Sequence, residues 1–378
     1  MTIEPDTKDW TWVLDAPCPE CGFDARVFTD ADLAPTVEAN ARGWRVALAA
    51  PDTRQRPTST TWSPLEYACH VRDVHRVFAE RVRLMLAEND PAFANWDQDV
   101  TAAEDRYDLQ EPAVVSGELA EAAQVMADLL RSVAGPQWSR TGRRSNGSFF
   151  TVDSIGRYYL HDIVHHLHDV GFDARSVTAA AYDADAPGYA AATSVASDSL
   201  RGAAARFAAA LAEGRRVLEI GTGSGRDALL LETAGVSVRR TDVTPGFVAV
   251  LREAGHDADL LDPLVDDLAD PADPDRPYDG VWANASLLHV DRSRLLLLLE
   301  RLAAVTRAGG ALWLSVKEGD GEAWSTHGTV SAARLFTFWR EAPLSAVLDR
   351  AGWRVLDVAH AHGASRDELW LNILAARR

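Results

Sequence analysis

Four histidines fall within the stretch HDIVHHLHDV at residues 161–170 of this chain. His161 and His165 lie four residues apart, so on a helix they project from one face about one turn apart, as ligands of one metal ion must. The neighbouring apolar residues Ile163 and Leu167 form a stripe that would turn this helix toward the core of a bundle. The spacing predicts a metal site, and the alternative is a cluster of exposed histidines without a metal.

A third candidate ligand lies upstream, in the stretch LEYACHVRDVHRVF at residues 65–78. His70 follows the helical spacing of a core-facing stripe, whereas His75 is expected to turn away from the core. A histidine among core residues needs partners for its ring nitrogens, and a metal shared with His161 and His165 would supply one. The candidate ion is divalent: zinc, iron or nickel. The alternative is a core histidine that is only hydrogen-bonded.

The stretch CPECG at residues 18–22 adds one C-x-x-C pair, which is half of a zinc site. Cys69, beside His70, could complete this site only if the N-terminal loop folds back onto the helix that carries them. A zinc or redox role for Cys18 and Cys21 and a tight turn that ends at Gly22 both remain open.

A different chemistry is indicated by RRVLEIGTGSGRDALLLE at residues 215–232. A predicted strand runs into a turn with three glycines, Gly221, Gly223 and Gly225. Glycine suits a backbone that turns sharply and lets a ligand lie against it. Asp242 ends the next predicted strand at the interval where a carboxylate can bind the ribose hydroxyls of an adenosine. Arg226 stands where the dinucleotide fingerprint needs its last glycine, so NAD fits less well.

The composition narrows the classes of partner. A formal net charge of -18 leaves no basic field for a phosphate backbone, which disfavours binding of DNA or RNA. No run of eighteen apolar residues occurs, and the first residues lack the pattern of a secretory signal, so we expect a cytoplasmic protein with no membrane partner. Three cysteines, an odd number, argue against a disulfide framework.

The spacing of apolar residues changes near the middle of the chain. Apolar periodicity predicts helices at 32–50, 63–88, 113–134 and 152–170. An Ala-, Ser- and Asp-rich segment at 174–198 follows, with no strong apolar period. Beyond it, short apolar runs alternate with helical stretches at 226–234, 245–255 and 291–307, which is typical of a parallel sheet with crossover helices. We expect an all-α four-helix bundle at 1–176 and an α/β domain at 177–378.

In residues 180–378 the ordered motifs resemble the class I S-adenosylmethionine (SAM)-dependent methyltransferases. The resemblance is carried by the glycine turn, Asp242, DADLLDPL at 257–264, YDGVWANASLLHV at 278–290 and GGALWLSVKEG at 309–319. It implies a Rossmann-like domain with seven strands, of which the last two form a hairpin. It also implies the cofactor-binding residues Glu219, Gly221, Thr222, Gly223, Gly225, Asp242, Asp262 and Asn284. Among these, Glu219 would face the methionine end of SAM, Asp242 the ribose and Asp262 the adenine amino group.

Methyl transfer requires alignment of donor and acceptor and removal of a proton from the acceptor. His289, after the fourth strand of this domain, is the candidate base. It could equally be a structural histidine that packs under the cofactor. The acceptor atom is not indicated by these residues.

The first half resembles the DinB-like four-helix metal-binding fold, which includes the mycothiol-dependent maleylpyruvate isomerases. The resemblance spans residues 10–172 and is carried by WSPLEYACHVRDV and YYLHDIVHHLHDV. It implies a metal held by His70, His161 and His165, with water or a thiol in the open position. A divalent metal makes a bound thiol ionise, so a low-molecular-weight thiol is a candidate partner.

These features together predict a SAM-dependent methyltransferase that acts on a small molecule, with a bundle that helps to bind or present the acceptor. The alternative is a metal- and thiol-dependent transferase or isomerase with an accessory SAM-binding domain. A third hypothesis is non-catalytic, with SAM sensed by one domain and assembly mediated by the other. A monomer and a homodimer are both compatible with the acidic surface.

Overall fold

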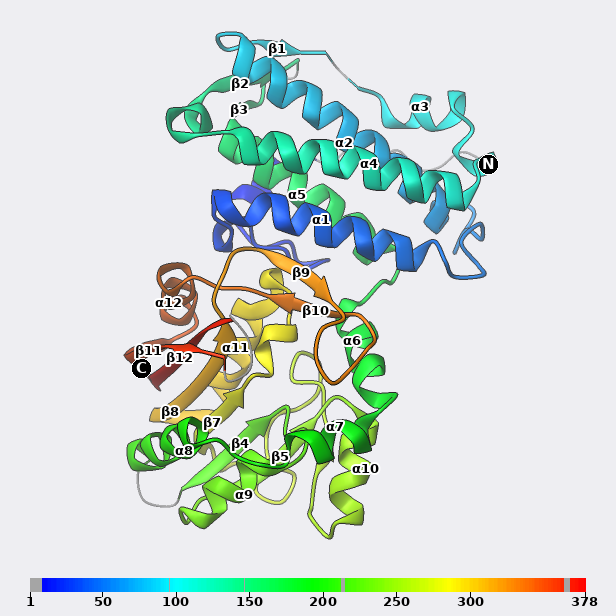
Figure 1. Cartoon of the computed structure of the whole chain (residues 1–378). Helices are drawn as coiled ribbons and strands as arrows, with labels where there is room; N and C mark the ends of the chain where they lie inside the picture. Colours follow the sequence, from blue (N-terminus) through cyan, green and yellow to red (C-terminus); the bar gives the residue numbers. More distant parts are fainter. Residues whose placement is uncertain (1–8, 95, 146, 212–214, 364–367) are drawn as a thin grey trace. The chain divides into compact units, whose positions relative to one another are not determined.

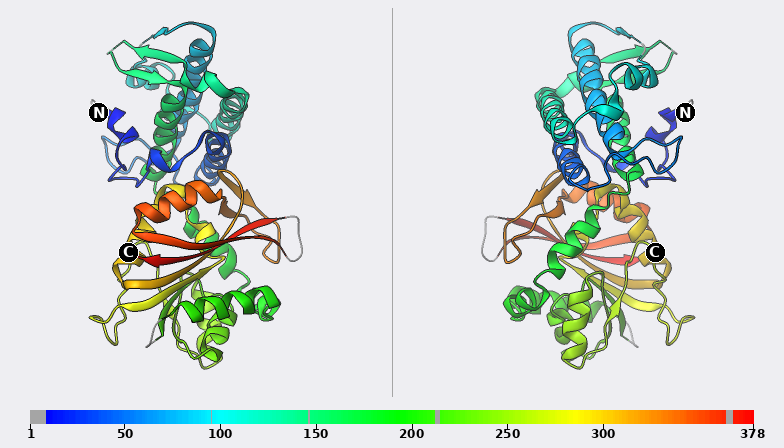
Figure 2. Two further views of the ribbon diagram at one scale, coloured as in Figure 1. Left: turned by 90° about the vertical axis from the view of Figure 1, so that its left-hand side faces the viewer. Right: turned by 90° about the vertical axis from the view of Figure 1, so that its right-hand side faces the viewer.

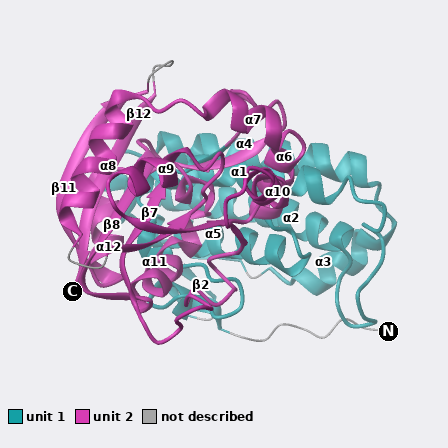
Figure 3. Ribbon diagram, turned by 90° about the horizontal axis from the view of Figure 1, so that it is seen from below, with its two compact units in different colours: residues 1–173, 321–323 teal, residues 174–320, 324–378 magenta. Residues whose placement is uncertain are grey.

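The structure, a computed structural model, describes residues 9–94, 96–145, 147–211, 215–363 and 368–378. It divides into two compact units, Met1–Asp173 with Gly321–Ala323 and Ala174–Asp320 with Trp324–Arg378, which Figure 3 colours separately. The first unit is helical and the second is α/β, as predicted. The domain boundary proposed at residue 176 lies within helix α6 (Ala174–Asp183), the first element of the second unit.

Four long helices make up most of the first unit (Figure 1), and they match the four predicted from periodicity: α1 (Asp30–Ala47), α2 (Pro64–Ala87), α4 (Pro112–Ser132) and α5 (Val152–Asp169). Helix α2 begins where Ser63 forms a reciprocal cap. The Ser63 hydroxyl accepts a hydrogen bond from the Glu66 N–H, and the Glu66 carboxylate accepts one from the Ser63 N–H. The start of this helix is therefore determined by local sequence.

Shorter elements, which periodicity did not predict, connect these helices: η1 (Trp10–Leu14), η2 (Ala25–Val27), α3 (Gln98–Glu104), η3 (Tyr107–Leu109), η4 (Gly135–Ser139) and a three-stranded sheet of β1 (Ala92–Phe93), β2 (Thr141–Arg144) and β3 (Phe149–Thr151). Each is too short to produce a readable apolar period.

The core of the bundle corrects one expectation. His75 does not turn away from the core: it is fully buried, and its Nδ1 lies 2.6 Å from the hydroxyl of Tyr159 on α5. Helix α2 packs against both α4 and α5, so side chains on two of its faces are covered. Burial lowers the pKa of His75 to about 3, which keeps this histidine neutral.

A seven-stranded sheet forms the centre of the second unit, in the order β11-β12-β8-β7-β4-β5-β6. Its strands are β4 (Arg216–Ile220), β5 (Ser237–Asp242), β6 (Asp259–Leu260), β7 (Tyr278–Asn284), β8 (Thr306–Lys317), β11 (Trp353–His362) and β12 (Leu369–Arg377). Strand β12 runs antiparallel to β8 and β11, and the other pairs are parallel. The predicted Rossmann-like domain with a terminal hairpin is confirmed.

Helices cover both faces of this sheet. They are α8 (Asp198–Ala210), α9 (Arg226–Thr233), α10 (Pro245–Glu253), α11 (Leu295–Ala304) and α12 (Glu341–Arg350). Figures 1 and 2 show α8 and α9 on one face and α11 and α12 on the other. Under α8, Phe207 packs edge-on against Trp282, which stacks on Trp313 with ring centroids 5.3 Å apart. These aromatic rings fill the space between helix and sheet.

Two helices of the second unit lie in the segment 174–198, where the sequence shows no strong apolar period. This segment contains α6 and α7 (Ala186–Thr193), because alanine favours helix even without a long apolar stripe. Two 3-10 turns, η5 (Leu287–His289) and η6 (Arg292–Arg294), follow β7, and β9 (Glu322–Ser325) pairs with β10 (Arg334–Thr337). Across the described parts of the chain, the helices are all too short or too polar to span a lipid bilayer.

Candidate functional sites

The order of strands in the second unit reverses between β4 and β7, which are parallel neighbours. In open α/β sheets, ligands bind beyond the carboxyl ends of the strands at such a reversal, because the connecting loops diverge there. The glycine turn follows β4 directly, and Ser286 lies just after β7. The predicted cofactor site therefore stands at the position where this fold leaves room for a ligand.

The three glycines of the turn after β4 differ in how closely other residues pack around them. Gly221 has a φ of 75°, and a Cβ at this position would lie 2.5 Å from Cβ of Ser286. Gly223 has a φ of 53°, but no atom lies within 4 Å of the place where its Cβ would be. Gly225, at the start of α9, packs against Leu251. The turn is therefore closely packed at Gly221 and open at Gly223.

Unpaired polar atoms surround this turn. Among the described residues, Oε2 of Glu219, Oγ1 of Thr222 and Oγ of Ser286 are buried and lack a hydrogen bond of normal geometry, although the hydroxyl of Thr222 lies near enough to Glu219 to oppose the rise of its pKa. Burial and the neighbouring charge of Asp227 raise the pKa of Glu219 to about 8. Buried polar groups without partners are rare and costly, so this site fits a polar ligand that supplies the missing hydrogen bonds.

Asp242 ends β5 on the other side of the glycine turn, and its side chain is buried. Its Oδ2 accepts a hydrogen bond from the Gly223 N–H, and its Oδ1 accepts one from the Thr244 N–H, both at 2.9 Å. A carboxylate can accept about four hydrogen bonds, so the two bonds to the backbone leave capacity for ligand hydroxyls. Burial raises the pKa of Asp242.

Two other residues that were predicted to bind the cofactor form hydrogen bonds with protein groups. Asp262 accepts hydrogen bonds from Nη1 of Arg175 at 2.9 Å and from the Leu264 N–H at 2.9 Å. Asn284 donates from Nδ2 to Asp227 at 2.8 Å, beside the indole of Trp282 that donates to the same carboxylate oxygen. Direct contacts of Asp262 and Asn284 with a cofactor stay predictions.

His289 belongs to a chain of hydrogen bonds. Its Nδ1 lies 2.7 Å from the carbonyl oxygen of Leu335, which can only accept, so this nitrogen carries the proton. Its Nε2 then accepts from the hydroxyl of Tyr182 at 2.9 Å, and Nη1 of Arg334 donates to the same hydroxyl at 3.2 Å. Burial, reinforced by the positive charges of Arg334 and Lys317, lowers the pKa of His289 to about 4. Sequence reasoning missed Tyr182 and Arg334 because their surrounding segments carry no motif.

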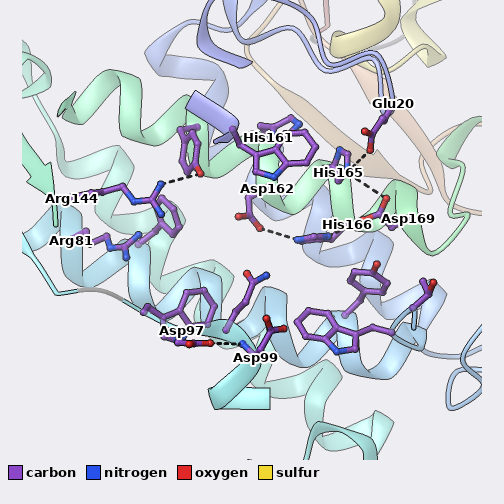
Figure 4. A pocket seen from close by; sticks show the side chains of 18 of the residues that line it. Glu20, Arg81, Asp97, Asp99, Arg144, His161, Asp162, His165, His166 and Asp169 are labelled. Carbon is purple, nitrogen blue, oxygen red and sulfur yellow. Dashed lines mark hydrogen bonds and ion pairs between the residues drawn. The ribbon is translucent and has the colours of Figure 1, made fainter. Parts of the chain in front are cut away.

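The first unit contains a separate cavity of about 650 Å³, shown in Figure 4. Asp162 and His166 line it, and Figure 4 shows these two side chains pointing toward each other. Oδ1 of Asp162 lies 3.5 Å from Nε2 of His166 and 3.7 Å from Nε2 of His70, which is buried beside them. These distances exceed a normal hydrogen bond, so the three groups face one another across a gap.

The side chains around this gap are of the types that bind metal ions. The ligand atoms of His70, Asp162 and His166 all lie within 4.8 Å of one another. Within the described part of the chain, both ring nitrogens of His70 and Oδ1 of Asp162 are buried without a hydrogen-bond partner. Two imidazoles and one carboxylate, with further coordination positions open, suit zinc or non-haem iron.

The predicted set of His70, His161 and His165 is divided in the structure. His161 and His165 form a group with Cys18 and Cys21, whereas His70 meets Asp162 and His166. Successive residues of a helix point about 100° apart, so the pairs 161/165 and 162/166 occupy adjacent faces of α5. Periodicity gives the spacing within each pair but does not show which face meets α2.

Two family models match the chain. Residues 36–170 match the model of the DinB superfamily, and residues 195–358 match a model described as a methyltransferase domain. A comparison with curated proteins found no match.

Several solved structures resemble one part of the chain. The 1,6-didemethyltoxoflavin-N1-methyltransferase of Burkholderia thailandensis, solved with S-adenosylhomocysteine, is 23% identical over 53% of this chain and 88% of its own, with a TM-score of 0.42. The CcbJ methyltransferase of Streptomyces caelestis is 19% identical over 48% and 90%, with a TM-score of 0.38. YfiT from Bacillus subtilis, described as a probable metal-dependent hydrolase, is 18% identical over 37% and 83%, with a TM-score of 0.34.

Proposed function

We propose that this chain, in which a DinB-superfamily domain precedes a methyltransferase domain, transfers the methyl group of SAM to a small molecule. The observation that carries the proposal is the buried carboxylate of Glu219, which has an unpaired oxygen beside the glycine turn where the strand order reverses. SAM offers an ammonium group and ribose hydroxyls, which are the kinds of donor that this site lacks.

In this proposal, Glu219 accepts a hydrogen bond from the ammonium group of SAM, and Asp242 accepts from the ribose hydroxyls. The open side of Gly223 lets the ligand lie against the backbone. SAM supplies a methyl group activated by its positively charged sulfur. The residues of the chain supply alignment, which is the main requirement of a displacement reaction.

We keep His289 as the candidate proton acceptor, acting through the hydroxyl of Tyr182. The low pKa of His289 keeps the ring neutral near neutral pH, so its Nε2 can accept a proton, but the same low pKa makes His289 a weak base. Arg334 donates to the Tyr182 hydroxyl and thereby orients its proton toward His289. The alternative role, in which His289 only fixes the position of Tyr182, uses the same hydrogen bonds.

The cavity of the first unit supports a role in binding the acceptor. Its volume falls in the range of small-molecule sites, roughly 300–1,000 Å³. Arg81 lines it and has no ion-pair partner among the residues that the structure describes, and burial, with the nearby charge of Arg144, lowers its pKa to about 10. Arg81 and Arg144 lie at one end of the cavity, and the carboxylates of Glu20, Asp97, Asp99, Asp162 and Asp169 line the rest of it. We therefore propose a polar acceptor, without assigning it a net charge.

A metal held by His70, Asp162 and His166 would add a second function to this cavity, because a divalent ion ionises a bound thiol. This favours, as the second candidate, a metal- and thiol-dependent transferase or isomerase with an accessory SAM-binding domain. An Asp162→Asn variant separates the two. Loss of thiol-adduct formation with methyl transfer unchanged would support the second candidate, whereas loss of methyl transfer alone would assign the cavity to the acceptor.

The proposed function is tested by incubating the full chain with methyl-labelled SAM and a panel of thiols, amines, alcohols and carboxylic acids. We expect formation of S-adenosylhomocysteine with at least one acceptor and its loss in a Glu219→Gln variant. SAM binding without turnover across the panel would contradict a catalytic role and support the third hypothesis, in which the domain senses SAM.

A further inference from the structure

The N-terminal segment brings a second group of metal-ligating side chains together. Cys18 and Cys21 lie against helix α5, and their sulfur atoms and one ring nitrogen each of His161 and His165 all lie within 4.8 Å of one another. All four residues are buried. Sγ of Cys18 lies 3.7 Å from Nδ1 of His165. The cysteine pair is therefore completed from α5, and Cys69 on α2 instead contacts Gln110.

We propose that Cys18, Cys21, His161 and His165 bind one zinc ion, in a site separate from the triad in the cavity. Two thiolates and two imidazoles are ligands that zinc prefers, and the spacings C-x-x-C and H-x-x-x-H are typical of structural zinc sites. Tetrahedral zinc with its usual bond lengths places the ligand atoms about 3.3–3.8 Å apart. The distance between Cys18 and His165 falls within that range.

The cysteine loop has the shape that such a site needs. The Gly22 N–H donates to the carbonyl oxygen of Cys18 and the Cys18 N–H donates to that of Phe23, both at 2.8 Å. Gly22 has a φ of 78°, a left-handed conformation that favours glycine. These bonds close a tight turn, which brings the two thiols together. The tight turn and the zinc site, which the sequence left as alternatives, are therefore parts of one arrangement.

Each of the two histidines has a ring nitrogen that can bind a metal ion. Nε2 of His161 is buried and, among the described residues, has no hydrogen-bond partner. Nε2 of His165 lies 3.5 Å from Glu20 and 3.6 Å from Asp169, as the dashed lines in Figure 4 mark, while its Nδ1 faces Cys18. A carboxylate on the outer nitrogen orients a metal-bound histidine and makes it a stronger ligand.

Asp169 connects this site to the cavity. Its Oδ1 faces His165, and its Oδ2 lies 3.0 Å from Nδ1 of His166, whose Nε2 faces Asp162. The N-terminal segment also contributes Trp10 and Glu20 to the wall of the cavity. Zinc binding would therefore fix part of the cavity wall and hold a histidine of each group in position. A closed site with four protein ligands has a structural role.

The inference does not depend on the proposed function and is tested by elemental analysis of the purified full chain. We expect the Cys18→Ser/Cys21→Ser double variant to hold one zinc ion per chain fewer than the native chain. Cys69→Ser is the matched control, because it removes the third buried cysteine without touching the site. Asp162→Asn should keep this zinc and alter only the metal of the cavity.

A second measurement uses the native sequence, so a failure of the variant to fold does not decide the matter. A thiol-specific mercurial is added to the native chain, and released zinc is followed with a chromogenic chelator. Release of one zinc ion per chain, together with cobalt(II) substitution that gives thiolate-to-metal absorption, would support the site. The same amount of zinc per chain in the double variant as in the native chain, or a Cys18–Cys21 disulfide in place of a metal, would overturn it.

Discussion

Glu219 is the residue on which the cofactor proposal depends most. It combines burial, an oxygen without a hydrogen bond of normal geometry among the described residues and a raised pKa, and it lies beside a turn that is closely packed at Gly221. A buried group with a strongly perturbed pKa is a candidate functional residue. The structural alternative, a protonated carboxyl buried in the core, leaves its hydrogen-bonding capacity unused.

The pKa of Glu219 predicts that SAM binding is linked to protons. Because this pKa is about 8, the carboxyl group is mostly protonated at pH 7, and an ammonium ligand binds better to the ionised form. The affinity for SAM should therefore rise as the pH approaches the pKa of Glu219, with protons released on binding at pH 7, and fall at higher pH, where the ammonium group of SAM loses its own proton. Calorimetry in two buffers with different ionisation enthalpies measures the release. The Glu219→Gln variant should release fewer protons on binding. An equal release from both proteins would contradict a contact between Glu219 and the ammonium group.

At the scale of elements, a buried charge network joins α2 to α4. Arg72 is buried and donates to Asp73, to Gln110 and to Glu118 on α4. Removing one member of such a network leaves the others with uncompensated polar groups. This network, together with apolar packing, holds α4 against α2, the helix that contributes Tyr67, Phe78 and Arg81 to the cavity.

Replacement of Arg72 by methionine is expected to destabilise the first unit by about 3 kcal/mol, because it leaves a buried carboxylate with fewer partners. Arg76→Ala is the matched control. Arg76 also pairs with Asp73, but its side chain is 49% exposed, so its loss should cost less than about 1 kcal/mol. Urea unfolding of the full chain, followed by tryptophan fluorescence, measures the free energy of unfolding of the native chain and of both variants. Equal losses of stability would contradict the network's importance.

The elements were predicted more successfully than the contacts between them. The four long helices and the glycine turn follow from periodicity, capping residues and glycine spacing, which are local properties. The grouping of His70 with Asp162 and His166 was not predicted, although Asp162 and His166 share the four-residue spacing that singled out His161 and His165. The partners of Cys18 and Cys21 depend on where the N-terminal segment packs, which no local pattern determines.

At the scale of the whole molecule, the two candidate sites lie in different units. The candidate SAM-binding residues lie in the second unit, and both groups of metal ligands lie in the first. Removal of metal by dialysis against a chelator, verified by elemental analysis, is therefore expected to leave the affinity for S-adenosylhomocysteine unchanged. The same treatment should lower the thermal stability of the first unit, because bound metal stabilises the folded state. A parallel loss of cofactor binding would contradict this independence.

The central claim, that the second unit binds SAM at the glycine turn, is tested most directly by calorimetric titration with S-adenosylhomocysteine. We predict binding of one molecule per native chain. In Gly221→Ala, the contact with Ser286 and a left-handed conformation that costs about 1–2 kcal/mol should weaken binding about tenfold or more. Gly202→Ala, on α8 with open space around it, should bind as the native chain does. No binding by the native chain, or equal binding by Gly221→Ala, would contradict the account.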